Sequence, residues 1–81
     1  TWIPFELSQD SEVLITIYDV SGIPVRNIHL GYLEAGSYVS RSKSVYWDGK
    51  TGAGERVSSG TYFYQIRAGD YAETQKMVVL K

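Results

Sequence analysis

The sequence predicts an all-β protein in which two antiparallel sheets stack face to face. Three observations support this: apolar residues lack the three-and-four spacing of a helix, turn residues recur about every 8–12 positions, and several segments alternate apolar with polar side chains. Aromatic residues make up 14% of the 81-residue chain. Tyrosine and tryptophan favour the half-buried surface of a pleated sheet, so composition agrees with periodicity.

The alternating segments define about seven strands. The clearest of them covers residues 13–20 and places Val13, Ile15 and Ile17 on one face. The other strands are expected over residues 2–7, 24–30, 37–47, 56–58, 61–68 and 71–80. Pro4 assigns the first strand to a sheet edge, because proline has no N–H to donate to a ladder.

Turn residues separate these strands. Gly31 and residues 33–36 are expected to form the connection after the third strand. The polar middle of the segment 37–47 predicts either a bulge or a split into two short strands. Gly69 and Asp70 are expected to form a two-residue hairpin turn between the last two strands.

The inward faces of such strands build one core. We expect it to contain Phe5, Leu7, Val13, Ile15, Ile17, Val25, Trp47, Tyr62, Tyr64, Ile66, Met77 and Val79. A seven-stranded antiparallel β-sandwich in this order fits the Ig-like and fibronectin type III-like architectures. A chain of this length forms a single domain, residues 1–81.

Composition argues against several classes of function. The net charge is −1 and no basic stripe is present, so the sequence predicts no nucleic-acid partner. The chain has no cysteine, which excludes disulfides, thiolate metal sites and cysteine nucleophiles. Residues 77–80 form the longest apolar run, which is too short for insertion into a membrane.

Catalytic residues do not form a recognisable pattern. His29 is the one histidine, and no nucleophile-elbow motif surrounds any serine. The carboxylates are scattered over strand ends and turns, and no local spacing brings two of them together. We therefore expect that the protein is not an enzyme and uses no cofactor.

A glycine-rich acidic loop between residues 48 and 55 allows two interpretations. Asp48 and Glu55 could supply carboxylate ligands to a cation such as calcium, together with backbone carbonyls. Lys50 places a positive charge inside that site, which favours a structural role instead. In that role Asp48 accepts backbone N–H groups and closes the turn after Trp47, as in an Asx-turn.

Aromatic side chains outside the expected core also allow two interpretations. Trp2, Tyr38 and Tyr46 could form a platform for a glycan, because small β-sandwich modules bind sugars on exposed aromatic rings. Alternatively, the same residues cover sheet edges and strand ends. Residue types alone do not separate the two.

An ordered set of segments carries a family resemblance. These segments are FEL (5–7), IYDVSG (17–22), YWDG (46–49), SGTYFY (59–64) and KMVVLK (76–81). Together they resemble the Ig-like C-terminal domain of large bacterial exported proteins. That domain is similar to the Ig-like domain of the flagellar hook-capping protein and to the C-terminal sorting domain of the Por (type IX) secretion system.

The resemblance implies a non-catalytic C-terminal module of a larger exported protein, located outside the cell or on its surface. Sorting or attachment would proceed through recognition by secretion-machinery or cell-surface proteins, or by the rest of the parent protein. The residues that the resemblance assigns to this recognition are Lys76, Met77, Val78, Val79, Leu80 and Lys81. The alternatives are a carbohydrate-binding module of a glycan-active enzyme and a structural spacer or assembly domain.

Overall fold

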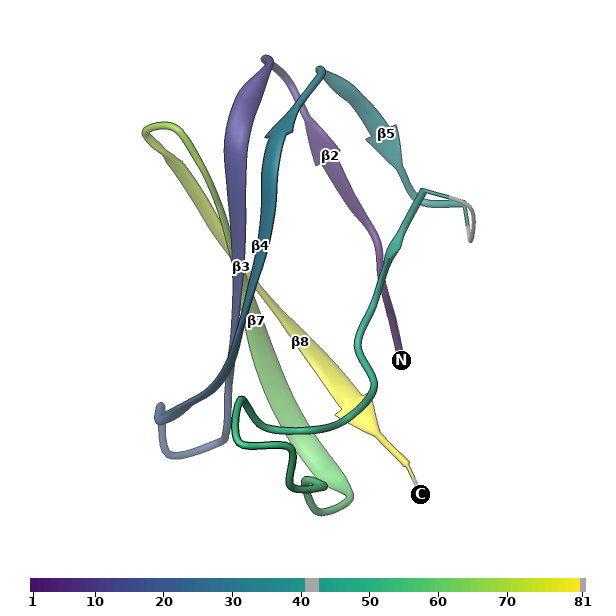
Figure 1. Cartoon of the computed structure of the whole chain (residues 1–81), viewed down its shortest axis with the longest axis vertical. Coiled ribbons are helices and arrows are strands. Elements are labelled where there is room, and N and C mark those ends of the chain that lie inside the picture. The colour runs from purple at the N-terminus through teal and green to yellow at the C-terminus, as the bar shows by residue number, and fades with distance from the viewer. Residues whose placement is uncertain (41–42, 81) are drawn as a thin grey trace.

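The computed structural model describes residues 1–40 and 43–80. Every regular element in these ranges is a strand (Figure 1). The strands are β1 (Trp2–Ile3), β2 (Phe5–Leu7), β3 (Ser11–Tyr18), β4 (Pro24–Leu33), β5 (Gly36–Tyr38), β6 (Val45–Tyr46), β7 (Gly60–Ala68) and β8 (Tyr71–Val79). No helix in the described ranges is long and apolar enough to cross a membrane.

The four long strands form one antiparallel sheet in the order β4-β3-β7-β8. Strand β3 pairs on both sides, so that Ile15 lies opposite Ile28 of β4 and Ile66 of β7. Alternate side chains of a strand share a face, and Val13, Ile15 and Ile17 are all buried on theirs. The most regular segment of the sequence therefore becomes an inner strand of the sheet.

Two short ladders, β1–β6 and β2–β5, form the second layer and lie end to end (Figure 1). Pro4 separates β1 from β2, because proline interrupts the pattern of backbone hydrogen bonds. Each of these strands pairs on one side only among the described residues. The expected edge position of the first strand is confirmed.

The core lies between the two layers. Its buried hydrophobic residues are Ile3, Phe5, Leu7, Val13, Ile15, Ile17, Trp47, Val57, Tyr62, Tyr64, Ile66, Ala68 and Val79. Val25 and Met77, which the sequence also assigns to the core, are only partly buried, because β4 and β8 are edge strands. Ile3, Val57 and Ala68 are additional core residues. Val57 lies next to the bridged residue Arg56, outside any strand.

Strand β4 is longer than the sequence predicts. It continues through Gly31 to Leu33, where the sequence indicates a connection. The register shifts between Val13 and Leu14, which marks a β-bulge. Gly31 has a φ of +75°, a conformation that glycine adopts without steric cost, so the ladder passes through this residue instead of ending there.

The other differences explain why eight strands replace the expected seven. The first expected strand is divided at Pro4, and the segment 37–47 is divided into β5 and β6, as its polar middle predicts. Residues 56–58 form no strand. An isolated antiparallel β-bridge pairs Lys50 with Arg56 in that region.

Two turns show how local chemistry fixes the strand connections. The Asp19 carboxylate accepts the backbone N–H groups of Ser21 at 2.9 Å and Ile23 at 3.0 Å, which closes the β3–β4 turn. Gly69 has a φ of +62°, whereas Asp70 does not have a positive φ. This combination is typical of a type II′ turn and confirms the expected two-residue hairpin.

Candidate functional site

Strand β8 forms an open edge of the large sheet. It pairs with β7 along its length, and no other described strand pairs with it. Ala68 and Tyr71 flank the two-residue turn, so they exchange backbone hydrogen bonds. From this pair onward, the backbone N–H and C=O groups of successive β8 residues point alternately toward β7 and away from it. The backbone N–H and C=O groups of Thr74, Lys76 and Val78 therefore point away from β7.

The segment assigned to partner recognition is divided between two faces. Its outward side chains are those of Lys76, Val78 and Leu80, and the last two are 57% and 85% exposed. Met77 is half-buried and Val79 is 4% exposed, because both belong to the core side of β8. Lys81 lies outside the described residues. Only alternate residues of this segment are thus available to a partner at the surface.

The first half of β8 is polar on its core side. Tyr71, Glu73 and Gln75 share this face and are all exposed, although Ile66 of β7, directly opposite Glu73, is buried. The Gln75 amide donates to Glu73 Oε1 at 3.3 Å. Hydrogen bonding to the Glu73 carboxylate, followed by desolvation, raises the pKa of Tyr71. The second layer leaves this part of the sheet uncovered.

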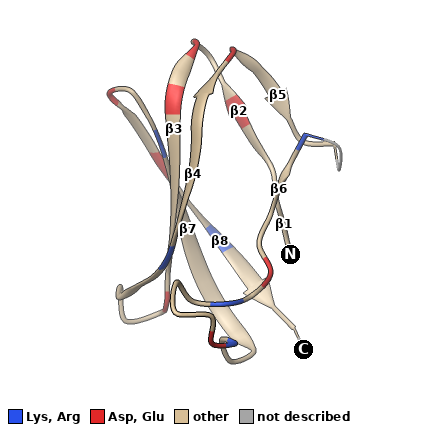
Figure 2. Cartoon of the chain, viewed as in Figure 1, with Lys and Arg blue, Asp and Glu red and all other residues tan. Residues whose placement is uncertain are grey.

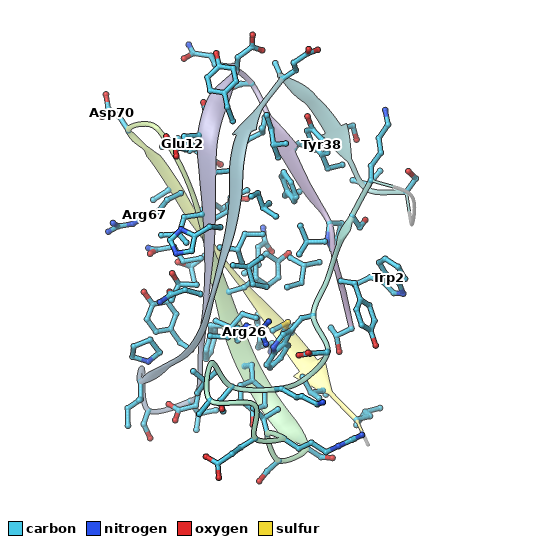
Figure 3. The ribbon with its side chains drawn as sticks, in the orientation of Figure 1. Trp2, Glu12, Arg26, Tyr38, Arg67 and Asp70 are labelled. Carbon is cyan, nitrogen blue, oxygen red and sulfur yellow. The ribbon has the colours of Figure 1, made fainter. Side chains whose placement is uncertain are left out.

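Two of the three aromatic residues considered for glycan binding lie together. Trp2 and Tyr46 are cross-strand partners whose ring centroids lie 5.0 Å apart at an interplanar angle of 60°. Tyr38 lies elsewhere on the second layer (Figure 3). Its ring stacks on Phe5 at 4.8 Å, and its hydroxyl donates to the Glu34 carbonyl at 2.6 Å. The structure does not gather the three rings into one platform.

The Asp48–Glu55 loop is organised by hydrogen bonds within the protein. The Asp48 carboxylate accepts the backbone N–H of Lys50 at 3.0 Å and forms a salt bridge of 3.1 Å with Arg26. The Lys50 hydrogen bond, helped by the Arg26 charge, lowers the pKa of Asp48. The Glu55 backbone N–H donates to Thr51 Oγ1 at 3.3 Å. The Asx-turn interpretation of Asp48 is therefore confirmed.

A metal site at Asp48 and Glu55 remains a prediction from the sequence. Across residues 1–40 and 43–80, no group of three or more His, Asp or Glu side chains is arranged to hold a metal ion. Asp48 Oδ1 accepts hydrogen bonds from both the Lys50 backbone N–H and the Arg26 guanidinium. The observed contacts of Asp48 are those of a structural turn.

His29 is exposed on β4, opposite Leu14 of β3. It contributes to a hollow of about 300 Å³ that Glu12 and Arg67 also line. Figure 3 shows Glu12 and Arg67 on the same side of the large sheet. No serine lines this hollow, so the arrangement does not resemble that of a serine hydrolase.

The two-layered antiparallel architecture and its open edge strand define an Ig-like β-sandwich. The chain belongs to the FlgD Ig-like domain family, whose model matches residues 3–71. The solved structure of FlgD from P. aeruginosa is similar over 95% of this chain, with 29% sequence identity and a TM-score of 0.74. The present chain spans 57% of the length of that FlgD chain. No curated protein matches the sequence.

These matches confirm one half of the sequence resemblance and correct one inference from it. The similarity to the hook-capping Ig-like domain is confirmed, whereas similarity to the Por sorting domain is not shown. The FlgD-like hook-capping scaffold family is non-enzymatic, and membership of this family suggests a structural or assembly module. The expected location outside the cell or on its surface after export is overturned, because the family is that of a protein assembled at the flagellum.

Sequence reasoning did not find the uncovered face of β8. Periodicity correctly predicts a strand there, but it does not say whether another layer lies above it. A signal was nevertheless present: residues 71–76 read YAETQK and contain no large aliphatic side chain on either face. A strand with that pattern packs poorly against a dry core.

Proposed function

We propose that the domain is a structural module in protein assembly that recognises a protein partner through the outer edge of β8. The observation that supports this is the row of outward backbone groups at Thr74, Lys76 and Val78, which have no strand partner in the described ranges. Such an edge is a template for an added strand. Main-chain hydrogen bonds would supply affinity, and alternate side chains would supply specificity.

The side chains along the edge suggest how the partner is selected. Lys76 is exposed near the middle of the open edge, where a lysine discourages unselective pairing between strands. Val78 and Leu80 follow on the same face and are largely exposed. A suitable partner strand would therefore present a carboxylate toward Lys76 and apolar side chains toward Val78 and Leu80.

A domain exchange tests this proposal. Residues 1–81 replace the matching domain of P. aeruginosa FlgD, and incorporation of the chimera into flagella is scored together with motility. We expect the chimera and its Lys76→Ala variant to assemble, because both keep the outward N–H at position 76. The Lys76→Pro variant removes that N–H from the edge and should fail to assemble.

Two controls make the exchange interpretable. Thermal unfolding of the three isolated domains establishes that Lys76→Pro folds, as an edge position allows. FlgD carrying its own domain provides the reference for assembly. Equal assembly of the Pro and Ala variants would refute recognition through the β8 edge.

Export sorting and glycan binding are more specific roles than assembly, and they are supported by the sequence alone. The 60° angle between the Trp2 and Tyr46 rings allows one ring, not both, to lie flat beneath a sugar. A passenger protein fused to residues 1–81, with and without residues 76–81, tests sorting directly. We favour the assembly role because it agrees with the family of the domain.

A further inference from the structure

An open cleft separates the β2–β3 turn from the tip of the β7–β8 hairpin. It has a volume of about 1000 Å³ and is lined by residues 6–11 on one side and 68–71 on the other. Leu7 and Ala68 contribute apolar surface, and both are more than nine-tenths buried. The Tyr71 side chain is 51% exposed and provides an accessible aromatic ring.

The cleft exists because the two layers diverge at this end of the molecule. The tip of the β7–β8 hairpin and the β2–β5 ladder point apart at the top of Figure 1. Neighbouring strands rotate by roughly 20–25°, so a four-stranded sheet carries its edge hairpin away from a short second layer. Strand β2 pairs only with β5 among the described strands, so its opposite edge is also open.

The surface beside the cleft has the shape that an extended chain requires. Tyr71, Glu73 and Gln75 continue from the cleft along the uncovered core side of β8. Three alternate residues of a strand span about 14 Å at about 3.4 Å per residue. A segment of about five extended residues would lie along this length, and its inward side chains would contact Tyr71 and the apolar groups of the cleft.

The charges around the cleft specify the chemistry of such a segment. Glu6, Asp10 and Asp70 line it, and no lysine or arginine does. Figure 2 shows acidic residues gathered at this end of the domain. Asp10 accepts the Ala35 backbone N–H at 2.7 Å, whereas Glu6 and Asp70 form no ion pair with a described residue. A ligand with positive side chains would neutralise this surface.

We propose that this cleft binds a basic, extended segment of a protein partner in which lysine or arginine alternates with apolar residues. The alternation places apolar side chains against Leu7, Ala68 and Tyr71 and basic ones near Glu6 and Asp70. This surface differs from the outer edge of β8. The two therefore provide separate contacts for an assembly partner.

The probe is the synthetic peptide acetyl-Val-Lys-Val-Lys-Val-amide, titrated into the ¹⁵N-labelled 81-residue chain. We expect saturable shifts of the amide signals from residues 6–11 and 68–75. Glu6→Gln and Asp70→Asn should each weaken binding about two- to fivefold, as the loss of an exposed ion pair does. Glu55→Gln is the matched control, because it removes a carboxylate from the loop outside the cleft, and it should leave the affinity unchanged.

Two further measurements distinguish this cleft from other surfaces. The Val-Glu-Val-Glu-Val analogue should not bind, and binding of the lysine peptide should weaken as salt increases. Lys76→Pro blocks the β8 edge without touching the cleft, so it should bind the peptide normally. The proposal is overturned if the lysine peptide gives no saturable shifts, if both peptides bind equally, or if Lys76→Pro abolishes binding.

Discussion

Strands β7 and β8 are the two arms of one hairpin, each nine residues long, yet they have opposite relations to the core. In β7 alternate residues from Tyr62 to Ala68 are buried, whereas the first six residues of β8 are exposed on both faces. The backbone ladder between them is continuous. Strand formation and burial are thus separate properties of this domain, and the second layer decides only the latter.

The comparison also explains where recognition is expected. The covered part of the sheet provides stability, because its side chains lose contact with water. The uncovered part retains polar side chains and unpaired backbone groups, which a partner can engage. Substitutions in the two parts should therefore have different consequences, and the following predictions are arranged from the largest expected effect to the smallest.

The first prediction concerns one cross-strand pair. Ile66 of β7 is 2% exposed and lies opposite the exposed Glu73 of β8. Ile66→Ala should lower the free energy of unfolding by about 2–5 kcal/mol, because it leaves a cavity in the core. Glu73→Ala should change it by less than about 0.5 kcal/mol. Urea denaturation measures the free energy of unfolding of both variants. Similar losses of stability in the two would contradict the distinction between the two arms of the hairpin.

The second prediction addresses the loop that covers the opposite end of the sheet. The Trp47 indole N–H donates to the Lys50 carbonyl at 2.9 Å, and Arg26 donates to the same oxygen at 3.0 Å. Trp47→Phe should cost about 1–2 kcal/mol of unfolding free energy through the lost hydrogen bond and some lost packing. A double-mutant cycle with Arg26→Ala checks this account. If the free-energy changes of the two substitutions are strictly additive, the shared Lys50 carbonyl does not couple Trp47 and Arg26.

The third prediction concerns the tip of the hairpin. Gly69 has a φ of +62°, so Gly69→Ala should destabilise the domain by about 1–2 kcal/mol through backbone strain. Gly52→Ala is the matched control, because Gly52 does not have a positive φ and a Cβ there would meet no atom within 4 Å. Thermal unfolding of both variants gives the difference. Equal effects would argue against a left-handed residue at the turn.

The smallest expected effect is the acid dependence due to Asp48. Its pKa is lowered from 3.8 in the folded state, mainly by the Lys50 backbone hydrogen bond. The associated stabilisation is therefore present above the unfolded pKa and is lost as pH falls through the lower, folded pKa. Unfolding measured between about pH 5 and pH 2 should lose less stability in Asp48→Asn than in the natural chain. Parallel pH profiles would contradict this assignment.

The local sequence pattern was sufficient to predict those features in which residues contact only their own strand or turn. The alternation at Val13, Ile15 and Ile17 predicts both the strand and its buried face, and both are confirmed. Asp48 likewise forms the expected Asx-turn, since the N–H that it accepts is only two residues away. Such features depend on backbone geometry and on short spacing along the chain.

Features that depend on distant segments were not predicted. The continuation of β4 through Gly31 requires a bulge opposite Val13, which belongs to another strand. The cleft was missed because its walls are separated by more than fifty residues of sequence.

The sequence alone determined that the chain forms antiparallel strands, where most of them lie and which faces are apolar, because those properties follow from alternation and from turn residues. The tertiary structure decided how far the second layer extends over the large sheet. Strand twist and the shortness of that layer leave the first half of β8 uncovered. The polar composition of residues 71–76 is compatible with this exposure, but burial is decided by what another part of the chain places above the strand.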